Sequence, residues 1–261
     1  MKKTIILLAA AVLTLTTTAM AGVVVDQEIS SDGPMGATSS KRTLEIQGHK
    51  QKVVSSSHSV ITDLDNGVMI LVDPKNKTYT EMPFPPTQFG GHQSPAAFKI
   101  TFKKTGVEKT EKGYKCEEYV GTGHMMMGDY TITGCFTKEA PGAAEYTAFD
   151  KTLASKLKGT AMETEGARPE GVPLVLNSLT KMDPSTMPGL SPERAKMIQN
   201  HPNMTSTTRT TDVKVANLPA DTFSVPSGYT KRDLPRQSTA PAGHPMPPSH
   251  PPVGNAPKVP E

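Results

Sequence analysis

The residues whose types could support chemistry gather in one stretch, Tyr114 to Phe136. It holds both cysteines of the chain, Cys116 and Cys135, and between them the run His124-Met125-Met126-Met127. Two thiols can form a disulfide, bind a metal or act as a catalytic pair, and an oxidising compartment favours the disulfide. An imidazole beside thioethers is a soft ligand set that suits Cu(I).

The Met-rich run also has a purely structural interpretation, since methionine is an adaptable apolar filler that packs on a neighbouring loop or sheet edge. It could equally present an apolar contact to a membrane or a partner. Ligands of the same kinds recur near the C-terminus, at His244, Met246 and His250. Spacing alone fixes no coordination geometry, so metal binding stays an alternative.

Catalytic motifs are not evident in the sequence. There is no nucleophile motif or glycine-rich phosphate loop, and Asp63 and Asp65 are better interpreted as the flanks of a turn. His58, His92 and His201 are scattered, as exposed loop histidines are. We therefore expect no catalytic residue, no cofactor and a non-enzymatic protein.

The N-terminus has the order of a secretory signal peptide. Lys2 and Lys3 precede the apolar run from Ile5 to Leu15, and Ala19-Met20-Ala21 precedes Gly22. The run is too short to span a bilayer, and no comparable run follows it. We expect residues 1–21 to be removed after Ala21, leaving a periplasmic protein without a transmembrane segment.

Composition bounds the remaining chain. Removing Lys2 and Lys3 lowers the formal net charge from +3 to +1, which gives no electrostatic footprint for nucleic acid. There is no tryptophan, so the core must rely on aliphatic side chains and methionine. From Leu234 the chain holds nine prolines in 28 residues and no aromatic residue, which predicts a disordered tail over residues 234–261.

The elements that must position these residues are mostly strands. A hairpin with the two cysteines facing each other would pair Val120 with Thr131 and Gly123 with Gly128, leaving residues 124–127 as the tip. Alternation on its second strand puts Tyr130, Ile132 and Gly134 in step.

The N-terminal half predicts a meander. Strands are expected over Val23 to Ile29 and Ser40 to Val54, and Asn66-Gly67 predicts a hairpin between Val60–Leu64 and Val68–Val72. A turn at residues 73–77 leads to a strand at residues 78–80, a proline-rich loop follows over residues 82–95, and Phe98 to Phe102 resumes a strand before a turn at residues 106–112.

The second half predicts two helices. Apolar residues three and four apart, Tyr146, Phe149, Leu153 and Leu157, indicate a helix over residues 141–158. Ser191-Pro192 begins a shorter helix that ends near Asn200. Residues 163–169 are loop-like, short strands are expected at residues 172–176 and 205–216, and Phe223 and Val225 are inward candidates near the end.

Several segments together resemble one family. They are "VMILVDPKNKTY" at residues 68–79, "GYKCEEY" at residues 113–119, "CFTKEAPGAAEYTAF" at residues 135–149 and "LPADTFSVPSGY" at residues 218–229. The chain resembles the exported bacterial family known as domain of unknown function 4412, which in turn resembles carriers of the LolA type. This resemblance implies a curved, incomplete β-barrel with helices in its concavity, and it implies no catalytic residue.

The expected fold is thus mainly β (α+β), with a curved antiparallel sheet or incomplete barrel over residues 22–233 and one or two helices in its hollow. The expected function is binding or carriage of a hydrophobic ligand, a lipid or a lipidated partner; the alternatives are copper handling and a structural envelope role. The helix over residues 141–158 either closes the sheet or moves as a lid. Candidate pocket residues are Leu44, Ile46, Ile70, Ile100, Phe102, Tyr146, Phe149, Leu153 and Leu157.

Overall fold

The computed structural model describes residues 21–34, 36–85, 88–89, 92–93, 99–125, 128–160, 163–187 and 189–233. The predicted signal peptide, apart from Ala21, and the predicted tail lie outside these residues, so both stay predictions. The strands are β1 (Gly22–Asp32), β2 (Thr38–Gln47), β3 (Lys50–Ser55), β4 (Ser59–Asp63), β5 (Val68–Asp73), β6 (Thr78–Pro83), β7 (Gln88–Phe89), β8 (His92–Gln93), β9 (Lys99–Glu111), β10 (Tyr114–Met125), β11 (Gly128–Thr137), β12 (Thr164–Gly166), β13 (Val172–Met182), β14 (Asn203–Ala216) and β15 (Thr230–Lys231). The helices are α1 (Ala143–Leu157), η1 (Pro184–Thr186) and α2 (Pro192–Asn200).

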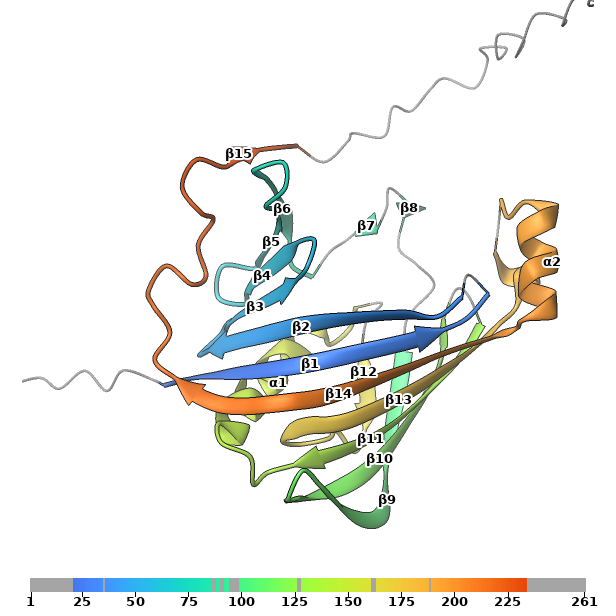
Figure 1. Cartoon of the computed structure of the whole chain (residues 1–261), viewed down its shortest axis with the longest axis horizontal. Coiled ribbons are helices and arrows are strands. Elements are labelled where there is room, and N and C mark those ends of the chain that lie inside the picture. The colour runs from blue at the N-terminus through green and yellow to red at the C-terminus, as the bar shows by residue number, and fades with distance from the viewer. Residues whose placement is uncertain are drawn as a thin grey trace, which may run out of the picture.

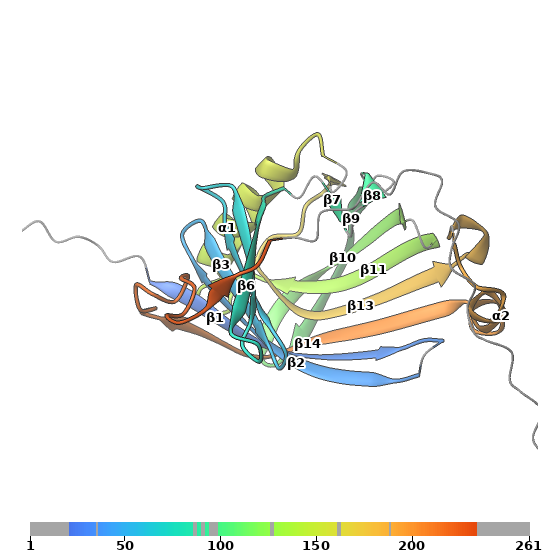
Figure 2. The same cartoon turned by 90° about the horizontal axis from the view of Figure 1, so that it is seen from above.

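One 13-stranded sheet makes up most of the molecule, in the order β12-β9-β10-β11-β13-β14-β1-β2-β3-β4-β5-β6-β15. It is antiparallel except at its ends, where β12 joins β9 and β15 joins β6 in parallel. The sheet is strongly curved and stays open, with β3–β6 at a steep angle to the long strands and α1 on the concave side (Figures 1 and 2). The predicted mainly β fold with a curved sheet is therefore confirmed.

Helix α1 fills one end of the concavity. Phe149 is 2% exposed and packs in a cluster with buried residues of β1 and β2, which include Val25 and Leu44. Polar contacts also hold the helix: the amide of Gly48 donates to Glu145 Oε1 at 2.5 Å, and the amide of Gly171 donates to Thr147 Oγ1 at 2.9 Å. The helix begins at Ala143, two residues later than predicted.

Helix α2 does not pack in the concavity. It lies beyond the far ends of β13 and β14, away from α1 (Figures 1 and 2). Ser191 caps it by accepting from the amide of Arg194, as the Ser-Pro start predicts, but none of its residues is buried. Its apolar Met197 is 43% exposed. Of the one or two helices expected in the hollow, only α1 is found there among the described residues.

The disulfide is confirmed, but the hairpin register is not the predicted one. Cys116 and Cys135 are bonded with their Cα atoms 5.4 Å apart, yet Cys135 pairs with Glu118 and Val120 pairs with Thr133. The bond therefore joins diagonal neighbours on one face instead of directly opposed residues. The shift of two residues shortens the connection, so that Met125 pairs with Gly128 and His124 belongs to β10. Met126 and Met127 lie outside the described residues.

Several predicted strand limits are wrong: β12 lies in the segment expected as a loop over residues 163–169, and β13 continues six residues beyond the strand expected over residues 172–176. The segment expected as one strand over residues 40–54 is the hairpin β2–β3, because Gly48 at φ +57° turns the chain. The turn expected at residues 106–112 lies only at Lys112-Gly113, both with positive φ, as a two-residue hairpin turn requires. Gly106 lies at a bulge inside β9. Its φ of +80° is in the left-handed region, which favours glycine.

The Asn66-Gly67 hairpin forms where predicted, but with a different turn. Only Gly67 has positive φ, and the turn spans residues 64–67. Asp63 holds it by accepting from the amides of Asp65 and Asn66 at 3.1 and 3.0 Å. Leu64, which we expected at the end of a strand, is fully buried in the α1 cluster from its place in the turn.

Candidate functional site

The concave side of the sheet, called here the inner face, can be followed residue by residue through the strand pairing. Paired residues of neighbouring strands point to the same face. Leu44 packs with α1, so the row of partners Val25, Leu44, Val53, Val60 and Leu71 lies on the inner face.

A second inner row crosses the other half of the sheet. It runs through paired residues of β9, β10, β11, β13, β14 and β1: Phe102, Gly121, Ile132, Ser178, Ser206 and Ser31. Both rows meet in β1, where Val25 and Ser31 are six positions apart and therefore point to the same face. The inner face is therefore continuous from β9 to β5.

Five of the predicted pocket residues form core beside α1. Leu44, Ile46 and Phe149 are buried in one cluster, and Tyr146 and Leu153 are half-buried against it. Leu157 is half-buried on α1 but outside this cluster. At this end of the concavity the helix itself thus occupies the space that the sequence suggested for a ligand.

Ile70 lies on the other face of the sheet. It pairs with Ile61, which pairs with Lys52, whereas the inner residue Val60 pairs with Leu71. The structure therefore does not bring Ile70 together with Leu44. Ile100 and Phe102, by contrast, are on the inner face, in the part of β9 that pairs with β12, the strand that follows α1.

The half of the inner face beyond α1 carries an apolar strip, which we define by five half-buried side chains. They lie outside the cluster that α1 forms, and come from β1, β9, β11 and β13: Ile29, Phe102, Tyr130, Ile132 and Leu176. Ile100 and Tyr119 are 7% exposed beside them. Burial raises the pKa of the Tyr130 phenol, and a hydrogen bond with Ser178 offsets part of this effect.

Glycines let the strip lie flat on the sheet. A Cβ atom on Gly121 would be 2.7 Å from both Ile132 Cγ2 and Phe102 Cε1, and one on Gly134 would be 2.6 Å from Leu176 Cδ2. Neighbouring side chains therefore fold over the positions where glycine has none. The result is a low apolar floor on the concave side.

Hydroxyl groups border the strip. Ser31 Oγ donates to Ser206 Oγ at 3.1 Å, and Thr180 is 3% exposed in the row that includes Tyr130. These side chains are neutral, so they bring no charge to the border of the strip. The outer face differs sharply: Glu28 and Lys41 are paired across β1 and β2 and form an exposed ion pair at 2.9 Å.

A polar line separates the strip from the α1 cluster. Arg42 Nε donates to Gln27 Oε1 at 2.8 Å, Gln27 Nε2 donates to Thr210 Oγ1 at 3.3 Å, and Thr210 Oγ1 donates to the carbonyl of Pro173 at 2.6 Å. Gln27 and Thr210 are each 2% exposed. Burial lowers the pKa of Arg42 from its ordinary value, with the side chain still a cation at neutral pH.

A second arginine near α1 is paired. Arg168 binds the Asp150 carboxylate through Nε at 2.8 Å and Nη2 at 3.0 Å, a bidentate ion pair, and also contacts Thr164. Tyr146 lies near these charges, and burial raises the pKa of its phenol far above the ordinary range.

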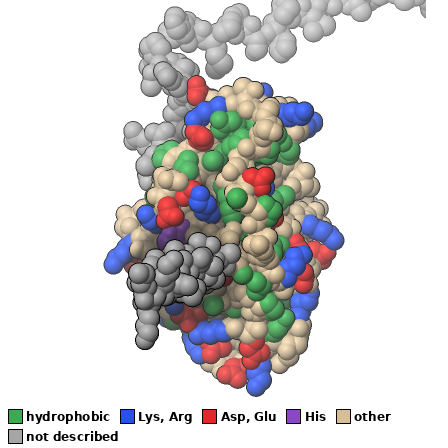
Figure 3. Space-filling view, turned by 90° about the vertical axis from the view of Figure 1, so that its left-hand side faces the viewer, with side chains coloured by type: hydrophobic (Ala, Val, Ile, Leu, Met, Phe, Trp, Pro, Cys, Tyr) green, Lys and Arg blue, Asp and Glu red, His purple; other side chains and the backbone are tan. Residues whose placement is uncertain are grey.

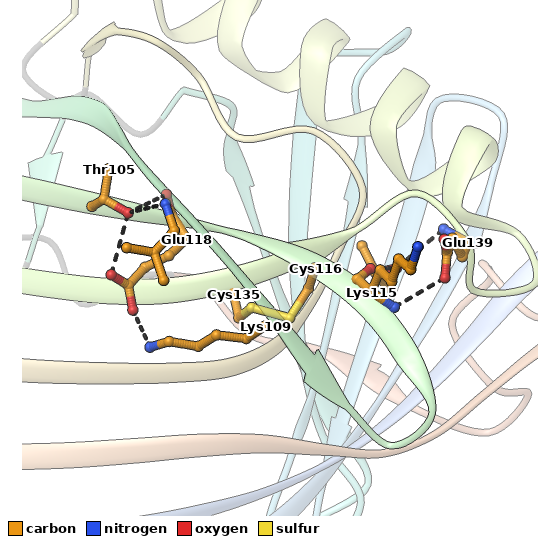
Figure 4. The surroundings of a disulfide bond; sticks show 9 residues. Thr105, Lys109, Lys115, Cys116, Glu118, Cys135 and Glu139 are labelled. Carbon is orange, nitrogen blue, oxygen red and sulfur yellow. Dashed lines mark hydrogen bonds and ion pairs between the residues drawn. A yellow bond between two sulfur atoms is a disulfide. The ribbon is translucent and has the colours of Figure 1, made fainter.

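The disulfide lies away from the strip. Cys116 and Cys135 form a small cluster with buried Leu174. Figure 4 shows polar residues around it: Glu118 contacts Lys109 and Thr105, and the amide of Lys115 donates to Glu139 at 2.9 Å. The bond therefore tethers β10 to β11 outside the five residues of the strip, and Tyr114, which packs against the cysteines, also packs against the α1 cluster.

The residues of the metal hypothesis are only partly described. His124 is exposed, and its Nδ1 lies 3.0 Å from Asp129 Oδ1. Met126, Met127, His244, Met246 and His250 lie outside the described residues, as does the side chain of Met125. Within the described part, no group of three or more His, Cys, Asp or Glu side chains could hold a metal ion.

Charge and hydropathy add two further observations. The end of the molecule drawn in Figure 3 carries basic and acidic side chains interspersed with one another. Across the described ranges, no helix has the length and apolar character needed to span a membrane.

Sequence reasoning missed most of the strip and the polar line. Ile29, Leu176 and Arg42 were not among the candidate residues, although Tyr130 and Ile132 were recognised as alternating on one strand. The same period of two in residues 172–182 and 25–31 was the available signal. To use this signal, one has to know which strands are neighbours in the sheet.

Several solved structures are similar to the chain at low identity. One of PNGF-II has 10% identity and a TM-score of 0.40; the match covers 82% of this chain and 31% of that one, so the chain spans about a third of it. A putative outer membrane lipoprotein-sorting protein domain from Vibrio parahaemolyticus has 8% identity and a TM-score of 0.32, covering 79% and 91% of the two chains. A LolA superfamily protein from Nitrosomonas europaea has 7% identity and a TM-score of 0.30, covering 78% and 90%.

No curated protein matches the chain. A family model described as "Domain of unknown function (DUF4412)" matches residues 23–170, more than half of the sequence. The match includes β1 through β12 and α1, and it ends before β13 and β14 complete the sheet. The chain therefore belongs to the family of domain of unknown function 4412, as its sequence motifs suggested.

Proposed function

We propose that this protein is a periplasmic, non-enzymatic binding or carrier protein that holds the acyl chain of a lipid or lipidated partner on the apolar strip. The observation that carries the proposal is the strip itself: five half-buried apolar side chains on the concave face, outside the core that α1 forms. A lipid tail is flexible and apolar, and it can follow such a curved floor without hydrogen bonds.

The contrast between the two faces supports this assignment. Along β13, Leu176 and Ser178 face inward, whereas Asn177 is exposed on the outer face. Apolar side chains on a concave surface are what a hydrophobic ligand needs, and polar ones on the outside keep the protein soluble. The proposal also includes removal of residues 1–21, with Gly22 as the new N-terminus, and a proline-rich tail from Leu234.

The test uses the mature chain, residues 22–261, purified from the periplasm. Native mass spectrometry should find co-purified lipid, and the apolar dye 1-N-phenylnaphthylamine should bind and be displaced by fatty acid. The same spectra give the N-terminus from the mass. Absence of both bound lipid and dye binding would contradict the proposal.

A matched pair of variants places the ligand. Leu176→Asp should weaken dye binding by about tenfold or more, since it removes apolar contact and introduces a charge. Asn177→Asp, one residue along on the outer face, adds the same charge and keeps the acceptor for Thr207 Oγ1. It should bind like the wild type. Equal effects of the two substitutions would move the site away from the inner face.

A further inference from the structure

Arg42 has binding capacity that the fold does not use. Its side chain is on the inner face, because it pairs with Gln27 in β1 and Ser55 in β3, one step along β2 from Leu44. Among the described residues its one hydrogen bond is from Nε to Gln27 Oε1, and the phenol of Tyr146 on α1 lies within electrostatic range. Every buried polar side-chain atom in the described residues is hydrogen-bonded, so its two terminal nitrogens reach solvent.

The geometry holds this guanidinium in a fixed orientation. Gln27 is itself fixed by Thr210, and Thr210 by the carbonyl of Pro173, so three strands build the support. Arg168 gives the contrast, because its guanidinium is occupied by Asp150 and Thr164. In the described chain, no carboxylate forms an ion pair with Arg42.

The position of Arg42 relative to the apolar strip is equally specific. The next inner residues along β1 and β2 are Ile29 and Ser40, and Ile29 pairs with Thr208, whose partner is Leu176. The guanidinium thus lies where the strip ends and the α1 cluster begins. A cation with two terminal NH2 groups free of protein hydrogen bonds, at the end of an apolar floor, matches an amphiphile with one anionic end.

We propose that Arg42 binds the anionic head group of the ligand, a carboxylate or a phosphate monoester, while the acyl chain lies on the apolar strip. The inference rests on the proposed function and deepens it by naming the ligand class: single-chain anionic amphiphiles. The terminal nitrogens of Arg42 donate to two oxygens of the head group, and Gln27 keeps the guanidinium plane in place.

The test compares three ligands that differ only in the head group: palmitate, hexadecyl phosphate and hexadecanol. Each displaces the neutral dye 1-N-phenylnaphthylamine from the mature wild-type protein. At least one anionic ligand should bind about tenfold or more tightly than the alcohol, as charge-assisted hydrogen bonds imply. Which anion is preferred distinguishes a free fatty acid from a phosphate ester.

Variants assign the preference to Arg42. Arg42→Met keeps the apolar stem and should remove the preference for the anion while hexadecanol still binds. Lys41→Met is the matched control, because Lys41 is the adjacent cation on the outer face. It should retain the preference. Arg42→Lys should retain part of it, since a lysine keeps the charge without the planar fork.

The outcomes separate the two proposals. Equal affinity of the wild type for all three ligands would overturn the role of Arg42 and leave the carrier proposal standing. A preference that persists in a folded Arg42→Met protein would also overturn it. Failure of every ligand and of the dye to bind would remove the proposed function together with this inference.

Discussion

Replacing Phe149 by alanine is expected to lower the free energy of unfolding by about 4 kcal/mol. The ring is 2% exposed and packs among buried side chains of β1 and β2, so its loss removes apolar burial and leaves a cavity. Transfer of the ring contributes about 1.5–3 kcal/mol, and the cavity adds the rest.

The assay is urea unfolding of the mature chain with the disulfide intact, followed by far-ultraviolet circular dichroism because the chain has no tryptophan. With a urea m-value of about 2.5 kcal/mol/M, the midpoint should fall by about 1.6 M. Leu157→Ala is the control, since Leu157 lies on the same helix but outside the cluster. It should cost about 1 kcal/mol or less.

This experiment decides between a fixed helix and a movable lid. Glu145, Thr147 and Asp150 bind α1 to three other parts of the chain, and Phe149 packs in the cluster that α1 forms with β1 and β2. A lid must detach at small cost. Were Phe149→Ala to leave stability within about 1 kcal/mol of the wild type while dye binding changed, the reasoning for a fixed helix would be refuted.

Three further predictions follow from local contacts. Replacing Cys116 and Cys135 together by alanine should lower the free energy of unfolding by about 3 kcal/mol, because the bond closes residues 19 apart; unchanged urea unfolding would contradict this. Burial opposes ionisation of Asp63, but hydrogen bonds from Asn66 and Lys50 prevail and lower the pKa of its carboxyl below the ordinary value. Its stabilising effect is therefore complete above about pH 4 and is lost as the pH falls through the lowered pKa, so Asp63→Asn should reduce the difference in thermal stability between pH 7 and pH 3, and an unchanged difference would contradict this. Gly121→Val should lower the melting temperature and weaken dye binding, since its branched side chain would collide with the strip; intact binding would show that the floor is not the site.

Much of the local structure could be predicted from the sequence. The apolar stripe of α1, the Ser-Pro start of α2 and the alternation of Tyr130 with Ile132 each depend on residues only a few positions apart. The hairpin after Asp63 was found for the same reason. These local signals predict individual helices, strands and turns. The curved, mainly β fold was predicted from the family resemblance.

The site needed information that no local pattern contains. Ile70 and Leu71 differ by one position, and only the register of three consecutive hairpins decides which of them faces inward. The proposed role of Arg42 depends on Gln27 and Thr210, which come from strands at opposite ends of the chain. The disulfide register likewise differed by two residues, because either pairing allows the same bond.

The position of β1 has a consequence for how this molecule is assembled. Gly22 of β1 pairs with Ala216 of β14. Strand β1 is therefore synthesised early, but one of its two neighbouring strands is synthesised near the end of the domain. Until residues 203–216 are available, β1 presents a row of unpaired amides and carbonyls, the kind of border along which foreign strands attach. Contacts so distant in sequence also slow folding. A chain cut short before residue 203 should therefore be a substrate for chaperones and proteases and should not fold into a smaller version of the whole.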